Sequence, residues 1–372
     1  MATATYAGDL GPIALAERVL ALLAQGSFSA TYKYAVFIAL MDLCLEKTSR
    51  SGAPPEVLTT RQLAHKVVEL YWPHAGPFEG RVLRQGGVRP DHQAEILTAI
   101  VRFRACADPS ESLGRARLRG GPELERLVRL VEWKLIEMPL VRLQRIGSEE
   151  DRFLYQYNWD ERIRRSTVGS YQDGRPSTFD NRILLKPRVS EHLVRLNGVV
   201  RPLVHREWAA MVSRMNDLPE SQLEDFLFGV SRRSLQAVRD PLRDAQSDQC
   251  FYCGQRLGAD CEVDHFVPWA RYPDNGLDNL VAAHRKCNGR KSDFLAAADH
   301  VERWVERGQT GMGALTAIAA DLAWERDPNR TRSVAVAIYR AVPDDARLWL
   351  TGCEFVRVDE QHRDRLKRAL AS

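Results

Sequence analysis

Two short motifs that share one spacing stand in the second half of the chain. Cys250-Phe-Tyr-Cys253 is the first motif, and His284-Arg-Lys-Cys287 is the second. Pairs of Cys and His ligands separated by two residues are typical of a tetrahedral zinc site, to which each pair contributes two ligands. A shared ion would hold these two distant segments together. The sequence therefore predicts a structural Zn²⁺ site formed by Cys250, Cys253, His284 and Cys287.

Two alternatives to zinc stay open at this stage. A Cys-x-x-Cys motif also occurs in redox proteins, although no thioredoxin-like pattern of strands and helices surrounds Cys250 and Cys253. The other alternative is a pair of reduced core cysteines with a chance His-Cys spacing. Cys261 has no partner of this kind and is predicted to be structural.

The composition is that of a globular protein with more than one domain. The chain has 372 residues, of which 44% are hydrophobic and 27% are charged. Its seven cysteines are an odd number and fit a reducing compartment. We find neither an 18-residue apolar run nor a secretory leader, so we expect a cytoplasmic protein that does not enter a membrane. The net charge of +4 is compatible with a nucleic-acid partner.

Hydrophobic periodicity predicts a helical N-terminal region and a second domain around the Cys/His motifs. A change of period at 139–159 then predicts a β-hairpin, and a later helix over 189–216 carries Gly198 and Pro202, where we expect a kink or a break. The first predicted domain is a helical domain at 1–165, which ends in the hairpin and has a recognition or regulatory role. A linker or loop at 166–186 follows it. The second predicted domain covers 187–372 and has its compact core at 248–294.

Oxygen and nitrogen donors lie between and after the two Cys/His motifs. Asp264 and His265 end a short extended segment, and Asn288 and Lys291 lie on the same face of a predicted helix after Cys287. Carboxylate and amide oxygens are hard ligands that suit Mg²⁺ or Mn²⁺. The sequence therefore predicts a second, catalytic ion between Asp264 and Asn288.

These residues carry a family resemblance. The order Asp264-His265, then Asn279 in the triplet Asp-Asn-Leu, then Asn288 and Lys291 resembles the HNH endonuclease signature. The stretch is also similar to the HNH nuclease domain of RNA-guided CRISPR nucleases. The resemblance implies a ββα-metal nuclease fold, so the expected fold class is mainly α with small β-hairpins (α+β), in which a helical N-terminal region precedes the nuclease domain.

The resemblance also implies a role for each residue. His265 would be the general base, Asn279 would orient it by hydrogen bonding, and Asp264 and Asn288 would hold the catalytic Mg²⁺ or Mn²⁺. Lys291 would neutralise a phosphate or pair with Asp293 or Glu262. Asn288 stands where many members have His, and His284 could also face the catalytic ion; we favour zinc for His284 because Cys287 needs a partner.

Three functional hypotheses follow. The leading one is a metal-dependent endonuclease that cleaves nucleic acid, with DNA as the expected substrate. The resemblance suggests a role in bacterial phage defence. The second is a zinc-stapled nucleic-acid-binding module without activity. The third is a nuclease subunit that is active only in a complex with a protein partner or with a second copy of the chain.

Overall fold

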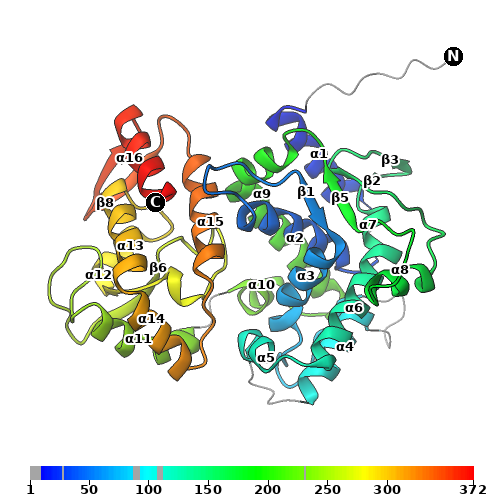
Figure 1. Ribbon diagram of the computed structural model, residues 1–372, viewed down its shortest axis with the longest axis horizontal. Helices are drawn as coiled ribbons and strands as arrows, with labels where there is room; N and C mark the ends of the chain where they lie inside the picture. The colour runs from blue at the N-terminus through cyan, green and yellow to red at the C-terminus, as the bar shows by residue number, and fades with distance from the viewer. Residues whose placement is uncertain (1–9, 27–28, 87–92, 107–111, 230–231) are drawn as a thin grey trace. The chain divides into compact units, whose positions relative to one another are not determined.

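The computed structural model describes residues 10–26, 29–86, 93–106, 112–229 and 232–372 (Figure 1). These residues divide into two compact units. The first unit contains the described residues up to Cys44 and those from Pro55 to Gly229. The second unit contains Leu45–Pro54 and the described residues that follow Gly229. Each unit is described by itself below.

Helices make up most of the first unit. Within it, α3 packs against α6, α4 packs against α6, and both α1 and α10 pack against α9. These helices are α1 (Pro12–Gln25), α2 (Tyr32–Glu46, of which the residues up to Cys44 belong to this unit), α3 (Thr60–His74), α4 (Glu95–Ala105), α5 (Leu113–Arg119), α6 (Pro122–Glu137), α7 (Pro139–Arg142), α8 (Arg165–Gln172), α9 (Val189–Asn216) and α10 (Glu220–Phe228).

Helix α2 contributes a continuous segment to the hydrophobic core. The periodicity of the sequence predicts one apolar stripe along this helix, yet every residue from Tyr34 to Cys44 is buried. A helix that is apolar on most of its circumference is stable only when neighbours cover all its faces. The polar exception is Asp42, whose carboxylate pairs with the buried guanidinium of Arg201 in α9.

Helix α9 is continuous over 28 residues, with Pro202 inside it. The expected break at Gly198 and Pro202 is therefore absent from this helix. Most of the stability of a helix in a protein comes from the packing of its apolar face, which here lies against α1 and α10. Among the described residues, no helix combines the length and the apolar character that crossing a membrane requires.

A small antiparallel sheet joins segments that are distant in the sequence. Its strand order is β1-β5-β4, in which β5 pairs with both neighbours. The strands of the first unit are β1 (Val57–Thr59), β2 (Arg145–Ile146), β3 (Glu149–Glu150), β4 (Tyr155–Gln156) and β5 (Arg182–Leu185).

The structure differs from two sequence predictions in this region. The predicted hairpin over 139–159 is reduced to the short β2–β3 pair, because its first residues form α7 and β4 pairs with β5 instead. The predicted linker 166–186 contains most of α8 and all of β5, and the main crossing of the chain from the first unit to the second comes only after Gly229. Short strands paired over long sequence separations leave little local periodicity, which explains both differences.

The second unit contains two antiparallel strand pairs, β6–β7 and β8–β9, together with helices. Helix α12 packs against β6 and β7, and α16 packs against α13 and α15. The chain as a whole is mainly α-helical with small antiparallel strand pairs, as the sequence predicts. The elements of the second unit are α11 (Arg232–Ala245), β6 (Cys261–His265), the 3₁₀ turn η1 (Leu277–Asn279), β7 (Leu280–His284), α12 (Arg285–Lys291), α13 (Ala298–Thr310), α14 (Met312–Asp321), α15 (Pro328–Arg340), β8 (Arg347–Thr351), β9 (Glu354–Arg357) and α16 (Glu360–Ala371).

Candidate active site and metal centre

The candidate site is built on β6, β7 and α12. The two strands are antiparallel, and His265, the last residue of β6, lies opposite Leu280, the first residue of β7. Helix α12 begins directly after β7, with His284 at its N-cap position. Side chains alternate between the two faces of a strand, so Glu262 and Asp264 share one face of β6 and His265 lies on the other.

The two Cys/His motifs meet at one point of the second unit. The ligand atoms of Cys250, Cys253, His284 and Cys287 all lie within 4.8 Å of one another. Cys253 Sγ is 3.3 Å from His284 Nδ1, and the backbone N–H of His284 donates to Cys250 Sγ at 3.4 Å. Zinc–sulfur bonds of about 2.3 Å in a tetrahedron imply ligand atoms ~3.8 Å apart. The cluster therefore has the composition and the size of a zinc site.

The ionisation of this cluster also fits a bound cation. Burial, reinforced by the neighbouring Cys250 and Cys253, raises the pKa of Cys287 to about 12. Thiolates are the forms that bind zinc, and a cation among them removes this repulsion. His284 Nε2 lies 3.0 Å from the carbonyl oxygen of Arg256, to which its N–H can donate. That contact leaves Nδ1, the atom that faces Cys253, as the ligand nitrogen.

His265 is buried at the end of β6. Its Nε2 lies 2.8 Å from Asn275 Oδ1, and its ring is 5.2 Å from the ring of Trp269. Burial lowers the pKa of His265 below its ordinary value. Asn275 was not among the predicted site residues, although it belongs to the sequence Asp-Asn-Gly, which is typical of a turn. Only the contact across the loop reveals its link to His265.

Asn279 holds the loop between the two strands closed. Its fully buried side chain accepts from the backbone N–H of Val267 at 2.8 Å and donates to the carbonyl oxygens of Val267 and Asp274, each at 3.1 Å. The sequence analysis expected Asn279 to orient His265 by hydrogen bonding. In the structure the partner of the His265 ring is Asn275, and Asn279 bonds to the loop backbone instead.

Asp264 and Lys291 form an ion pair inside the second unit. Lys291 Nζ lies 3.0 Å from Asp264 Oδ2 and donates to the carbonyl oxygen of His265 at 2.9 Å. The hydroxyl of Tyr252 donates to the same Oδ2 atom. Lys291 is fully buried. The sequence predicts a phosphate, Asp293 or Glu262 as its partner, whereas the structure pairs Lys291 with Asp264.

Asn288 lies on α12 beside Glu262 of β6. Its side-chain amide nitrogen donates to Glu262 Oε2 at 2.9 Å, and Glu262 Oε1 also accepts from Arg285 at 2.9 Å. The amide nitrogen of Asn288 is thereby engaged, and its carbonyl oxygen is the atom that a cation could use. Asp264 and Glu262 occupy the same face of β6, so acidic and amide oxygens gather between this strand and α12.

Two family models match the chain, one mainly in the first unit and one in the second. Residues 13–227, more than half of the sequence, match a family described as a domain of unknown function (DUF8808). The chain belongs to this family. Residues 250–297 match the HNH endonuclease family, and this match contains both Cys/His motifs and His265. No curated protein and no solved structure matches the chain.

The second unit of this DUF8808 protein thus carries an HNH endonuclease domain with a Cys₃His group that is suited to zinc. Such a domain supports the prediction of a metal-dependent nuclease that binds nucleic acid. The HNH match lies in the second unit, and the DUF8808 match covers most of the first unit.

A segment that follows the HNH match holds the loop between β6 and β7 in place. Asp274, Asn275, Leu277 and Asp278 all belong to this loop, and each bonds to the chain between 324 and 331. The contacts are Trp324 Nε1 to the Asn275 carbonyl (2.7 Å), Leu277 N–H to the Glu325 carbonyl (3.0 Å), Arg326 Nε to Asp278 Oδ1 (3.1 Å), Thr331 Oγ1 to Asp274 Oδ2 (2.9 Å) and Arg330 Nη2 to Asp274 Oδ1 (3.3 Å). The loop that carries Asn275 is therefore positioned from outside the family match.

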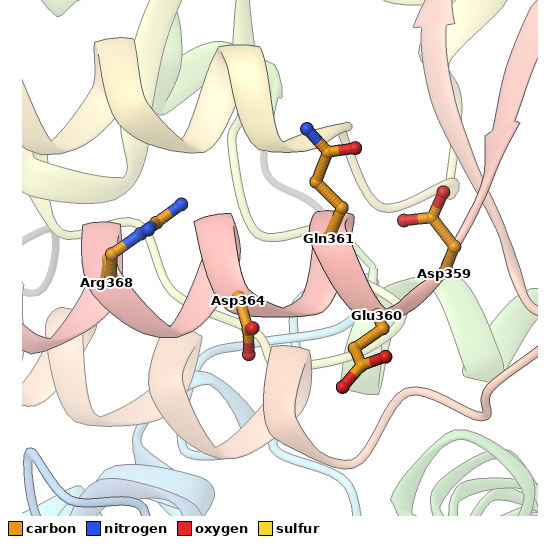
Figure 2. Close-up of a pocket in the computed structure, with 5 residues that line it drawn as sticks. All are labelled: Asp359, Glu360, Gln361, Asp364 and Arg368. Carbon is orange, nitrogen blue, oxygen red and sulfur yellow. The ribbon is translucent and has the colours of Figure 1, made fainter.

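A cavity of about 560 Å³ lies elsewhere on the second unit, along α16. Figure 2 shows that its lining side chains come from this helix and the residue before it: Asp359, Glu360, Gln361, Asp364 and Arg368. Three of these five side chains are carboxylates, which would repel a phosphate backbone. None of them belongs to the HNH match, so this cavity lies outside the candidate site.

Proposed function

We propose that this chain is a metal-dependent endonuclease that hydrolyses phosphodiester bonds in DNA. The observation that carries the proposal is the position of His265 at the end of β6, within the HNH match, next to Asp264 and with one ring nitrogen bonded to Asn275. A histidine with one bonded and one remaining nitrogen is suited to general base catalysis.

Asn275 determines which nitrogen of His265 acts. Its Oδ1 is a hydrogen-bond acceptor, so Nε2 of His265 carries the proton and Nδ1 keeps its lone pair. Nδ1 would take a proton from the water that attacks the phosphate. Because burial lowers the pKa of His265, the ring is neutral at pH 7 and ready to accept that proton.

Asp264 and Asn288 are the residues that we propose to hold the catalytic cation. Both contacts of the Asp264 carboxylate use Oδ2, which leaves Oδ1 for a ligand bond, and Asn288 has its carbonyl oxygen. These hard oxygen donors suit Mg²⁺ or Mn²⁺. When bound, the ion would stabilise the charge on the phosphate and on the departing 3′ oxygen. The expected products carry a 5′-phosphate and a 3′-hydroxyl.

Lys291 would act as a positioning residue rather than as a phosphate ligand. Its buried ammonium contacts Asp264 Oδ2 and the carbonyl of His265, and so links the two adjacent site residues to α12. A buried carboxylate without this partner would be costly. Lys291 therefore holds the Asp264 carboxylate in place.

Exposed cations on α12 support a nucleic-acid substrate. Arg285, Lys286 and Arg290 are all exposed on the helix that also carries Asn288. Side chains of this charge bind phosphates of a nucleic-acid backbone. We propose DNA as the substrate and expect a matched RNA to be cleaved more slowly. Bacterial phage defence in the cytoplasm is the setting that we propose from the resemblance to bacterial HNH proteins and from the thiol-based zinc cluster.

The test is cleavage of supercoiled plasmid with Mg²⁺ or Mn²⁺. The wild-type protein should nick the plasmid, and His265→Ala should reduce the rate about 100- to 10,000-fold, the usual contribution of a general base. His65→Ala is the matched control, because His65 is an exposed histidine of the first unit. Matched single-stranded DNA and RNA identify the preferred substrate.

Other outcomes of this test separate the competing hypotheses. If neither wild type nor His265→Ala cuts while both bind DNA, the zinc-stapled binding module replaces the nuclease. If cleavage appears only after a partner protein is added, the chain is a subunit of a licensed complex. Equal cleavage by wild type and His265→Ala would contradict the assignment of the general base.

A further inference from the structure

A second candidate binding site lies in the first unit, outside the HNH match. It is a cavity of about 490 Å³, which is within the range of ~300–1,000 Å³ that small-molecule sites occupy. The residues that line it come from α1, α2, α9 and the loop after α3. They are Leu23, Ala24, Gly26, Tyr34, Arg84, Glu207, Met211, Arg214 and Met215.

Two arginine side chains, Arg84 and Arg214, line this cavity together with Glu207, and neither forms an ion pair within the described residues. Arg84 Nε is buried and has no hydrogen-bond partner among the described residues. The described part of the chain likewise contains no ion pair of Arg214. A buried N–H without an acceptor is unfavourable, so a ligand that supplies an acceptor here would be favoured. An anion is the ligand that both arginines would bind.

The position of Arg84 is set by its own backbone. The backbone N–H of Arg84 donates to Asn216 Oδ1 at 2.8 Å, and Asn216 Nδ2 donates to the carbonyl of Arg84 at 2.8 Å. Asn216 is the last residue of α9, the helix that also carries Arg214. The two cationic side chains are therefore brought to one cavity by a specific contact between the loop and the helix.

The remaining wall of the cavity combines apolar side chains with Glu207 and is partly rigid. The ring of Tyr34 stacks against that of Trp208, with centroids 6.3 Å apart and planes inclined by 20°. Met211 and Met215 add flexible, polarizable side chains that adapt to flat ligands. Glu207 supplies a hydrogen-bond acceptor beside Tyr34. Burial of Tyr34 and, to a smaller extent, the charge of Glu207 raise the pKa of Tyr34 to about 12. An aromatic ring with N–H donors would match this wall.

We propose that this cavity binds a nucleotide, with its phosphate on Arg84 and Arg214, its base against Tyr34 and Met211, and an N–H edge of the base donating to Glu207. Guanine fits best, because adjacent N–H groups on its edge can both donate to one carboxylate. Such a site would make the DUF8808 part of the chain a ligand-binding unit. It requires neither zinc nor the catalytic cation.

The test is isothermal titration of the full-length protein with GMP, AMP and inorganic phosphate, without added Mg²⁺. GMP should bind more tightly than AMP, and inorganic phosphate should bind at least tenfold more weakly than GMP. Arg84→Met keeps the backbone contacts with Asn216 but removes the charge, and it should weaken GMP binding about tenfold or more. Arg206→Met is the matched control, since Arg206 is exposed on α9 and does not line the cavity.

Several outcomes would overturn the proposal. They are the absence of binding by both nucleotides, undiminished binding by an Arg84→Met protein that melts at the wild-type temperature, and equal affinity for GMP and inorganic phosphate. Loss of GMP binding in His265→Ala would move the site to the HNH domain. If Arg84→Met lowers the melting temperature, Arg214→Met, which changes an exposed side chain, replaces it in the titration.

Discussion

Two buried histidines, one in each unit, show how similar surroundings lead to different roles. In the first unit, His74 Nε2 contacts the carbonyl of Leu227 and Nδ1 contacts Gln85 Nε2, both at 3.0 Å. In the second unit, His265 bonds through Nε2 to Asn275, and Nδ1 makes no hydrogen bond among the described residues. Both rings have lowered pKa values because they are buried. The number of engaged nitrogens separates a structural histidine from a candidate base.

The network around His74 explains why no lone pair remains there. Gln85 is fully buried, and its Oε1 accepts from Thr31 at 2.9 Å and from the indole of Trp208 at 2.8 Å. Thr31 in turn shares a hydrogen bond with the hydroxyl of Tyr71. Every polar atom in this chain of contacts has a partner, which makes the network part of the core. The site around His265 lacks this closure.

The largest predicted effect concerns the difference in metal dependence between the units. A strong zinc chelator should remove about one zinc ion and unfold the second unit, while the first unit keeps its helices, because structural zinc stabilises small domains by about 10 kcal/mol or more. Metal analysis and circular dichroism measure both effects. Cys253→Ser and His284→Ala should reproduce the loss, whereas Cys353→Ser, at another exposed cysteine of the same unit, should retain zinc. Retention of zinc by His284→Ala would place His284 at the catalytic ion instead.

Replacement of each histidine by Ala should affect a different property, cleavage for His265 and stability for His74. His265→Ala is expected to lower the cleavage rate about 100- to 10,000-fold with little change in stability. His74→Ala should instead destabilise the first unit by about 2–4 kcal/mol, because it leaves the buried amide of Gln85 without its partner. Plasmid cleavage and thermal melting are measured on both proteins. A stable His74→Ala protein would remove the distinction drawn above.

The stability of the first unit should depend on pH through His74. Burial lowers its pKa from 6.5 to about 4, so the folded state holds the ring neutral while the unfolded chain protonates near pH 6.5. The stabilisation is complete above pH 6.5 and is lost as the pH falls toward 4, by about 2 kcal/mol between pH 7 and pH 5. Denaturant unfolding at these two pH values measures it.

A comparison of wild type with a His74 variant tests whether His74 causes this pH dependence. His74→Gln, which does not titrate, should be less stable at pH 7 but should lose less stability on acidification. His205, whose pKa burial also lowers and whose ring stacks on Phe228 at 4.0 Å, changes stability in the same direction and remains in both proteins. Identical pH dependence of wild type and His74→Gln would show that His74 is not the group responsible.

Removal of the partner of His265 should have a smaller effect than removal of His265 itself. Asn275→Ala leaves the ring without its acceptor, so we expect a cleavage rate about 10- to 100-fold lower at an unchanged KM. Asn275→Asp restores an acceptor and should recover much of the rate. A merely structural role would instead lower the melting temperature in both variants and leave the two rates equal.

The smallest predicted effect concerns the hydrogen bond that Trp324, outside the HNH match, donates to the loop carrying Asn275. Trp324→Phe keeps the ring but removes the hydrogen bond to the carbonyl of Asn275. A single neutral hydrogen bond contributes about 1 kcal/mol, so we expect a cleavage rate about fivefold lower. Trp304→Phe is the control, since its indole donates at 2.9 Å to the carbonyl of Asp278, away from Asn275. A larger loss of cleavage rate in Trp304→Phe would show that the contact at Asp278 matters more for cleavage than the contact at Asn275.

Local patterns predicted much of this protein. The helices around Tyr34, the Cys/His pairs and the Asp264-His265 dipeptide were all recognisable, because ligand spacing and helical periodicity involve residues that are close in the sequence. The linker predicted at 166–186 failed for the converse reason. Its strand β5 is defined by pairing with β1 and β4, and neither pairing leaves a local signal.

The sequence by itself determined the donor chemistry: thiols and imidazole in the two Cys/His motifs, and carboxylate, amide and imidazole in the candidate site around His265. Only the tertiary structure decided which groups meet. It joined Asn275 rather than Asn279 to His265, paired Lys291 with Asp264, and placed Arg84 beside Arg214 in the first unit. The physical reason is that a side chain's chemistry belongs to the residue, whereas its partners depend on packing between segments far apart in the chain.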